Sequence, residues 1–212
     1  MKNRTSQLLY SYWNDVRGDR MAPARFEIEP SRIAAILSET FILERTESGV
    51  FRFRLAGTRI CEQFGREFRG ENLMALFDAE DQDLIERDLK QISQQGAVGI
   101  LTIEAATQSG RLAEFEVMLL PLVHTHQAVN RILGTVSSSH APAWLGSEPM
   151  VAQRLLRQEL IWPAGRSHAV ASRMNRPAPV ALTTPQARIV ASNRRTFRVY
   201  EGGLGKHPNG KD

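Results

Sequence analysis

The single cysteine and the five histidines are the side chains of this sequence best suited to nucleophilic or metal chemistry. His124 and His126 stand two residues apart, and in an extended segment this spacing places both imidazoles on one side, where they could form a surface metal site. We favour a solvated loop, because no cysteine or acidic cluster nearby completes a zinc ligand set. Cys61 lies on the apolar face of an expected helix, and we interpret it as a small thiol that contributes to the core.

Motifs for the common catalytic sites are missing from the sequence. It contains no HExxH pair, no GxGxxG or P-loop glycine pattern, and no GxSxG turn. Acidic pairs such as Asp81/Asp83 and Glu114/Glu116 fit the solvated faces of a helix and a strand. We therefore expect a protein that is not an enzyme and holds no metal.

Charge is distributed unevenly along the 212 residues. Residues 1–140 carry 16 Lys/Arg against 19 Asp/Glu, whereas residues 141–212 carry 11 against 4. A basic tail can bind nucleic acid or an acidic partner. Its candidate phosphate contacts are Arg188, Arg194, Arg195 and Arg198. The alternative is a solvated, flexible extension, which we favour for residues 163–212 because they are rich in Pro, Ala, Arg and Ser.

The remaining composition is that of a globular protein, with 42% hydrophobic and 24% charged residues. One cysteine excludes an intrachain disulfide, which fits a reducing compartment. No apolar run approaches the roughly 18 residues that cross a bilayer, and the N-terminus lacks the apolar stretch of a signal peptide. We expect a cytoplasmic protein without a membrane span.

The elements that would position any site begin with two helices in residues 1–38. The first is expected to be capped by Thr5 or Ser6 and to end at Gly18. The second is expected to start at Pro30 and to run to about residue 37. One face of the first helix carries an apolar stripe made of Leu9, Tyr12, Trp13 and Val16.

Residues 39–140 read as the domain core, with five strands and inserted helices. Alternating residues predict strands at 41–43 and 51–55, joined by a turn at 47–49. Helices are expected at 58–65, capped by Thr58, and after Asp78 up to Gly96. Strands at 98–106, 112–123 and 131–138 complete an antiparallel sheet. Residues 141–162 are expected to pack on the domain, with 154–162 forming either a strand or a helix.

The segment Phe53–Gly65, followed by residues 66–73, resembles the second strand and first helix of a PAS sensory domain. The resemblance is strongest to a compact PAS family common in alphaproteobacteria, and residues 15–25 and Trp144–Gly146 add to it. It implies an α+β PAS fold: a five-stranded antiparallel sheet with helices on one face, a flanking N-terminal helix and a largely disordered C-terminal tail.

The resemblance also implies a cavity between the inner sheet face and the short helices. Its candidate lining residues are Phe53, Leu55, Ile60, Phe64, Leu73, Leu89, Ile103, Val117 and Leu119, together with Phe41 or Leu43 and Val136. The same residues would fill a core without a ligand, so both interpretations stay open. The cofactor is unknown: the Asn-Cys-Arg-Phe motif of flavin-binding relatives is absent around Cys61, and residues 79–95 hold no histidine for haem.

No kinase, cyclase or helix-turn-helix pattern follows the PAS-like segment. We therefore expect a sensory or regulatory module that acts through a protein partner or as a homodimer. The stripe Leu9, Tyr12, Trp13 and Val16 is the candidate interaction surface. Residues 112–123 are apolar on both faces of their strand, so this helix could instead cover the outer sheet face within one chain. The alternative function is a nucleic-acid-associated regulator that uses the basic tail.

Overall fold

The structure is a computed structural model that describes residues 1–125 and 128–165. The expectation of a flexible tail and the four tail arginines lie outside these residues, as does His126. In the described part of the chain, no helix is both long enough and apolar enough to span a bilayer.

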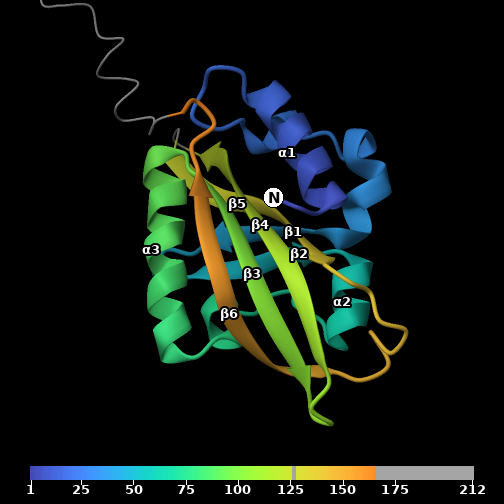
Figure 1. The fold of residues 1–212 in the computed structure, drawn as a ribbon. Helices are drawn as coiled ribbons and strands as arrows, with labels where there is room; N and C mark the ends of the chain where they lie inside the picture. Colours follow the sequence, from blue (N-terminus) through green and yellow to red (C-terminus); the bar gives the residue numbers. More distant parts are fainter. Residues whose placement is uncertain (126–127, 166–212) are drawn as a thin grey trace, which may run out of the picture. The chain divides into compact units, whose positions relative to one another are not determined.

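The core is one antiparallel sheet with the strand order β2-β1-β5-β4-β3-β6 (Figure 1). The five strands expected from the sequence are all present, and a sixth joins them at the β3 edge. The strands are β1 Thr40–Arg45, β2 Phe51–Ala56, β3 Val98–Thr107, β4 Leu112–Thr125, β5 Ala128–Ser138 and β6 Met150–Ile161.

The sixth strand corrects the expected five-stranded sheet. Most of the side chains of β6 are exposed or only half-buried, so its sequence lacks the alternation that marks a half-buried strand. Its place is fixed instead by pairing with β3 along nearly its whole length, from Val98 opposite Ile161 to Thr107 opposite Met150. The Asp81 carboxylate also accepts a 2.6 Å hydrogen bond from the Leu155 backbone N–H.

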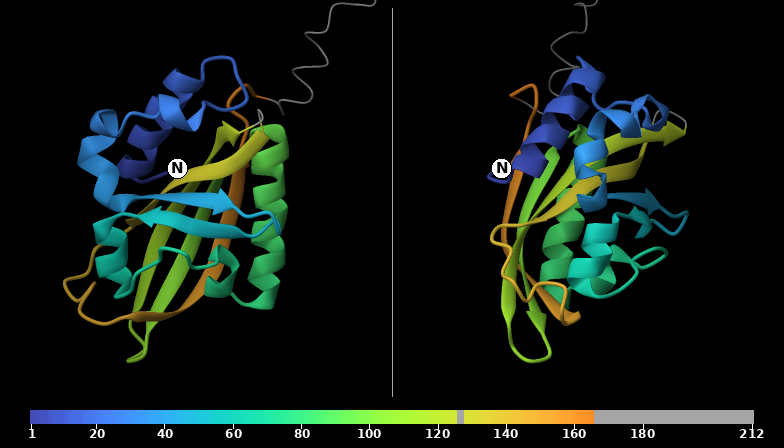
Figure 2. Two further views of the ribbon diagram at one scale, coloured as in Figure 1. Left: turned by 180° about the vertical axis from the view of Figure 1, so that it is seen from behind. Right: turned by 90° about the vertical axis from the view of Figure 1, so that its right-hand side faces the viewer.

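One face of the sheet is covered by α1 (Arg4–Arg17), with the short helices η1 (Arg25–Glu27) and η2 (Pro30–Glu39) beside it. These N-terminal helices lie together in blue in Figure 2, and of these η2 contacts α2. The cap of α1 is Asn3, which accepts from the Thr5 N–H at 2.9 Å; the expectation of Thr5 or Ser6 is wrong. Thr5 instead donates its hydroxyl to Glu39, and Ser6 is buried against Thr135.

The opposite face packs against α2 (Thr58–Phe64), η3 (Leu73–Leu76) and α3 (Ala79–Gln95), so helices lie on both faces. Asp78 caps α3 as expected, accepting from the Asp81 N–H at 3.0 Å. Thr58 is not the cap of α2, which begins after Gly57. A Cβ atom at Gly57 would lie 2.3 Å from the Ser38 carbonyl oxygen, so a glycine here allows the backbones before α2 and at the end of η2 to touch.

Candidate ligand cavity

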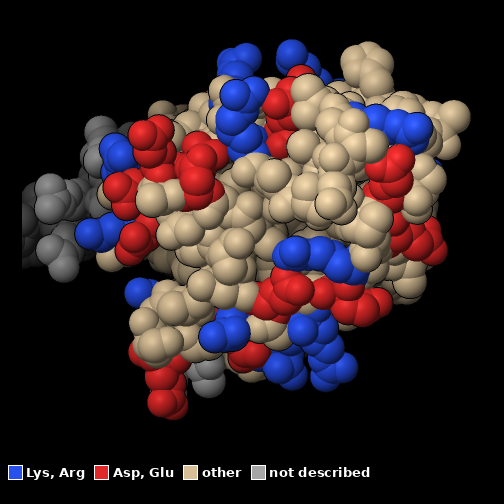
Figure 3. Space-filling model, turned by 90° about the horizontal axis from the view of Figure 1, so that it is seen from below, with Lys and Arg blue, Asp and Glu red and all other residues tan. Residues whose placement is uncertain are grey.

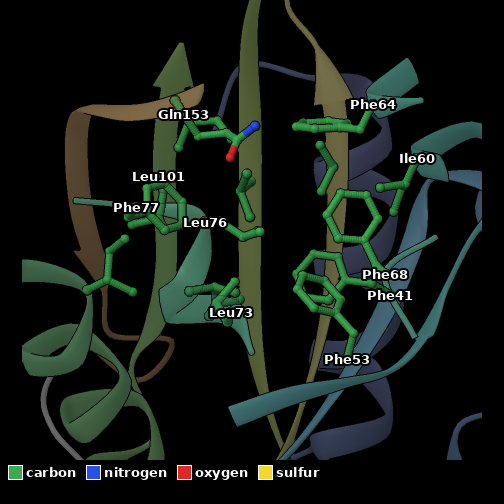
Figure 4. A pocket seen from close by; sticks show the side chains of 15 residues that line it. Phe41, Phe53, Ile60, Phe64, Phe68, Leu73, Leu76, Phe77, Leu101 and Gln153 are labelled. Carbon is green, nitrogen blue, oxygen red and sulfur yellow. The ribbon is translucent and has the colours of Figure 1, made fainter. Parts of the chain in front are cut away.

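A small cavity of about 40 Å³ lies between the inner face of the sheet and the helices α2, η3 and α3 (Figure 4). That volume can hold about one to a few water-sized groups, whereas pockets for drug-sized ligands measure roughly 300–1,000 Å³. The lining is apolar except for one amide. It consists of Phe41, Phe53, Ile60, Phe64, Phe68, Leu73, Leu76, Phe77, Ile85, Leu101, Ile103, Val117, Leu119, Val136 and Gln153.

Phenylalanine rings from separate elements make one wall of the cavity. The Phe53 ring of β2 lies 5.6 Å from that of Phe41 on β1 and 5.1 Å from that of Phe68, measured between ring centroids. Phe64 of α2 stands edge-on to Phe68 at 5.5 Å and packs on Phe115 of β4 at 4.9 Å. Tilted and edge-on pairs at these distances are favourable beyond their buried area. The rings therefore tie β1, β2, β4 and α2 into one packed unit around the cavity.

Seven of the nine residues expected at the cavity do line it: Phe53, Ile60, Phe64, Leu73, Ile103, Val117 and Leu119. Phe41 and Val136 also line it, while Leu43 is buried in the same core without reaching the cavity. Leu89 belongs to this core as well, but it lies one turn beyond Ile85 along α3 and borders a separate groove beside the β1–β2 hairpin.

Leu55 does not line the cavity, contrary to the expectation. Leu43 pairs with Phe53 but its neighbour Ile42 pairs with Leu55, which leaves Arg54 as an extra residue in β2. Such a bulge shifts the alternation of side chains by one. Leu55 therefore shares the outer face with Ile42, and its side chain is 48% exposed.

Six lining residues were not named as cavity candidates. Five of them, Leu76, Phe77, Ile85, Phe68 and Leu101, are apolar residues whose sequence pattern does not separate cavity from core. Gln153 could not be anticipated because its position depends on the pairing of β6 with β3.

Gln153 is the one polar side chain at the cavity wall. Its Nε2 atom is buried and has no hydrogen-bond partner among the described residues. Figure 4 shows its amide pointing inward between the rings and Leu101. An unsatisfied buried donor costs about 1–3 kcal/mol, so a ligand that offered an acceptor here would recover part of that cost.

Two titratable groups, on the helices α2 and α3, have perturbed pKa values. Burial raises the pKa of the Cys61 thiol, which is half-buried, packs against the core and lies 3.7 Å from the Glu67 carboxylate. It is therefore a poor nucleophile. Burial also raises the pKa of Asp88 on α3, against the weaker opposing effect of Arg87, and its Oδ2 has no hydrogen-bond partner in the part of the chain described.

The expected interaction stripe is largely used inside the chain. Leu9 and Trp13 are fully buried on the outer sheet face, and the Trp13 indole N–H donates to the Pro121 carbonyl at 2.9 Å. Tyr12 and Val16 pack at the margin of the same cluster, and the Tyr12 hydroxyl accepts from the Glu29 N–H at 2.7 Å. Cover of the sheet within one chain, the alternative left open by the sequence, is therefore what the structure has.

Charged side chains of the described residues do not form a candidate metal site. No group of three His, Cys, Asp or Glu side chains is placed to hold a metal within residues 1–125 and 128–165. Viewed from below (Figure 3), Lys and Arg side chains lie beside Asp and Glu side chains around a broad area without charges. This face therefore carries no large patch of one sign.

Comparison with known proteins gives a family match. A family model described as PAS domain matches residues 1–137. The LOV protein of Rhodobacter sphaeroides is similar in structure, with 12% identity over 51% of this chain and 65% of that chain and a TM-score of 0.41. The chain thus matches less than two thirds of that protein. The PAS domain of a Colwellia psychrerythraea protein is similar at 13% identity, over 51% and 94% of the two chains, with a TM-score of 0.39. No curated protein matches the sequence significantly.

Proposed function

This chain belongs to the PAS domain family of sensory and signalling modules, and we propose that it is a regulatory binding module that senses a small molecule in its cavity and signals through protein contacts. In this proposal the chain is not an enzyme. The observation that carries the proposal is the apolar cavity with one buried amide donor, Gln153 Nε2, that has no hydrogen-bond partner among the described residues.

The ligand that fits this site is a small, mainly apolar molecule with one hydrogen-bond acceptor. The aromatic and aliphatic lining favours apolar surface, and the Gln153 amide favours a carbonyl or ether oxygen. A ligand of more than a few atoms has to push packed side chains outward, because the cavity measures only about 40 Å³. Binding and a change of shape are therefore coupled in this proposal.

Strand β6 is the element best placed to carry such a change. It contributes Gln153 to the cavity wall, is held to α3 by the Asp81–Leu155 hydrogen bond, and leads along the chain into the basic tail. A ligand that engages Gln153 would act directly on this edge strand. A strand at a sheet edge has a neighbour on one side only, which makes it easier to displace than a central strand.

Native mass spectrometry of the purified full chain tests the proposal, because it reports bound small molecules and homodimers together. A matched pair of probes then tests the chemistry: cyclopentanone and cyclopentane have similar size, but only the ketone offers an acceptor. In ¹H–¹⁵N spectra we expect both to perturb residues around the cavity, and the ketone alone to shift the Gln153 side-chain amide. Absence of any co-purified ligand, together with unchanged cavity resonances at saturating probe, would refute ligand sensing.

A second candidate function rests on the uneven charge of the sequence. Residues 141–212 carry 11 Lys/Arg against 4 Asp/Glu, and Arg188, Arg194, Arg195 and Arg198 could contact phosphates. Binding of this kind weakens steeply as salt concentration rises, because counterions are released from the nucleic acid. Anisotropy of a labelled oligonucleotide at 50 and 200 mM salt, with the full chain, distinguishes it from the proposed protein contacts.

A further inference from the structure

A second hollow lies on the outer side of the sheet, away from the ligand cavity. It has a volume of about 390 Å³ and runs between η2, the end of β2 and the start of α2. Buried Ile28, Ile33, Ile42 and Leu133 are part of its lining. In the right-hand view of Figure 2, the pale blue η2 lies next to the cyan α2, and these two elements border the hollow. We call this hollow the outer groove.

Exposed apolar side chains gather at the outer groove. Leu55 and Leu37 line it with 48% and 38% of their surfaces exposed. Phe26, which is 86% exposed, lies in the chain between Arg25 and Ile28, which both line the groove. These three are among only seven large apolar side chains that are exposed in the described part of the chain. Exposed apolar surface clustered at a hollow is typical of an interaction site.

The border of the outer groove is positively charged. An adjoining hollow shares Arg25, Ile42, Leu55 and Ala56 with it and adds Arg54, Arg69 and Arg131, with Glu67 as its one acid. Arg54 and Arg131 both pair with Glu44, at 3.1 and 2.9 Å. Arg25 and Arg69 have no ion-pair partner among residues 1–125 and 128–165. Apolar surface is thus flanked by two guanidinium groups that form no ion pair within the described part of the chain.

We propose that the outer groove docks a short acidic, amphipathic segment of a partner protein. Apolar side chains of the segment would lie on Leu37 and Leu55, and its carboxylates would pair with Arg25 and Arg69, the arrangement by which amphipathic peptides bind apolar grooves. The tail of this chain is a poor occupant, because residues 166–212 carry nine Lys/Arg and only two Asp/Glu. This inference rests on the proposed signalling through protein contacts and names the surface.

Strand β2 connects the outer groove with the ligand cavity. Phe53 lines the cavity and Leu55, just beyond the bulge, lines the groove. The following Gly57 backbone touches the end of η2, whose Leu37 forms part of the groove. A ligand that pushes Phe53 outward therefore moves the strand that carries Leu55. Partner affinity can depend on the ligand through this one strand.

The test uses the full chain and two 15-residue amphipathic peptides with identical leucines, one with glutamates and one with lysines on its polar face. We expect the glutamate peptide to bind at least about tenfold more tightly, with ¹H–¹⁵N shifts clustered at residues 25–28 and 54–58. Double charge reversal, Arg25→Glu with Arg69→Glu, should abolish this preference. Leu55→Glu should weaken binding at least about tenfold, whereas Leu156→Glu, at a leucine 44% exposed on β6, should leave it unchanged.

Several results would overturn the inference. Equal binding of both peptides, or equal losses in Leu55→Glu and Leu156→Glu, would show that the groove is not selective. An RNA 20-mer that binds through Arg25 and Arg69 but is insensitive to Leu55→Glu would assign the surface to nucleic acid instead. Circular dichroism confirms that each variant is folded. If the peptides fail while native mass spectrometry still finds ligand and dimer, the proposed function stands and only the docking surface is wrong.

Discussion

Three substitutions in β2 can test which of its side chains face the core on either side of the bulge. Phe53 is 5% exposed and its ring packs against two others, with centroids 5.6 and 5.1 Å away. Replacing a buried phenylalanine with alanine costs about 3–5 kcal/mol, through lost transfer free energy and the cavity left behind. Leu55 keeps about half its surface in water, and full burial of a leucine is worth about 1.5–3 kcal/mol, so Leu55→Ala should cost about 1 kcal/mol.

The third substitution in β2 is Arg52→Ala. The exposed side chain of Arg52 donates to the Gly70 carbonyl at 2.8 Å, so Arg52→Ala should cost at most about 1 kcal/mol. Urea titration followed by circular dichroism measures all three free energies of unfolding. With a urea dependence of about 1–3 kcal/mol per molar, the Phe53→Ala midpoint should fall by at least about 1 M. Equal losses for Phe53→Ala and Leu55→Ala would show that both residues face the same core and that the bulge is wrongly placed.

Two further predictions concern buried groups on the two faces of the sheet. Asp88→Asn should flatten the pH dependence of stability. The folded-state pKa of Asp88 is raised, so the wild-type protein binds more protons than its unfolded chain and loses stability as pH rises from about 4 through the folded pKa. Urea titrations across pH 3–8 should show this slope in the wild type and not in the variant. Trp13→Ala should lower the free energy of unfolding by about 3–5 kcal/mol, measured by heat or urea, because Trp13 is fully buried and hydrogen-bonded to Pro121. Leu8→Ala, on the exposed side of α1, should lower it by under about 1 kcal/mol. Similar losses in the two variants would contradict the packing of α1 on its own sheet.

Local patterns in the sequence were sufficient for most elements of the fold. Residues such as Phe51 and Phe53 alternate with arginines, and Asp78 precedes an amphipathic helix, so β2 and α3 could be located from side-chain period and capping alone. The cap of α1 was misplaced by two or three residues because asparagine, serine and threonine are all good caps and occur close together.

The remaining errors have non-local causes. Leu55 faces outward because β2 contains an extra residue, and the apolar alternation of the sequence gives no sign of it. Residues 150–161 form a strand because they pair with β3 and because the Leu155 N–H donates to Asp81. Both contacts join residues far apart in the chain, so the local sequence pattern does not predict them. An apolar stripe such as that of α1 reads the same whether it covers its own sheet or a partner's, so only the packed structure decides between them.

The small size of the cavity determines how a ligand signal could arise. The walls come from β1, β2, β6, α2, η3, α3 and the central strands. Packed interiors respond to inserted volume by shifting between discrete arrangements rather than by gradual swelling. The most mobile wall is expected where an element has a neighbour on one side only, which describes the two sheet edges, β2 and β6. One edge borders the outer groove through Leu55, and the other leads to the basic tail. If β2 carries the change, linkage requires that an acidic partner in the groove raise the affinity of the cavity for its ligand by the same factor by which the ligand raises the affinity for the partner.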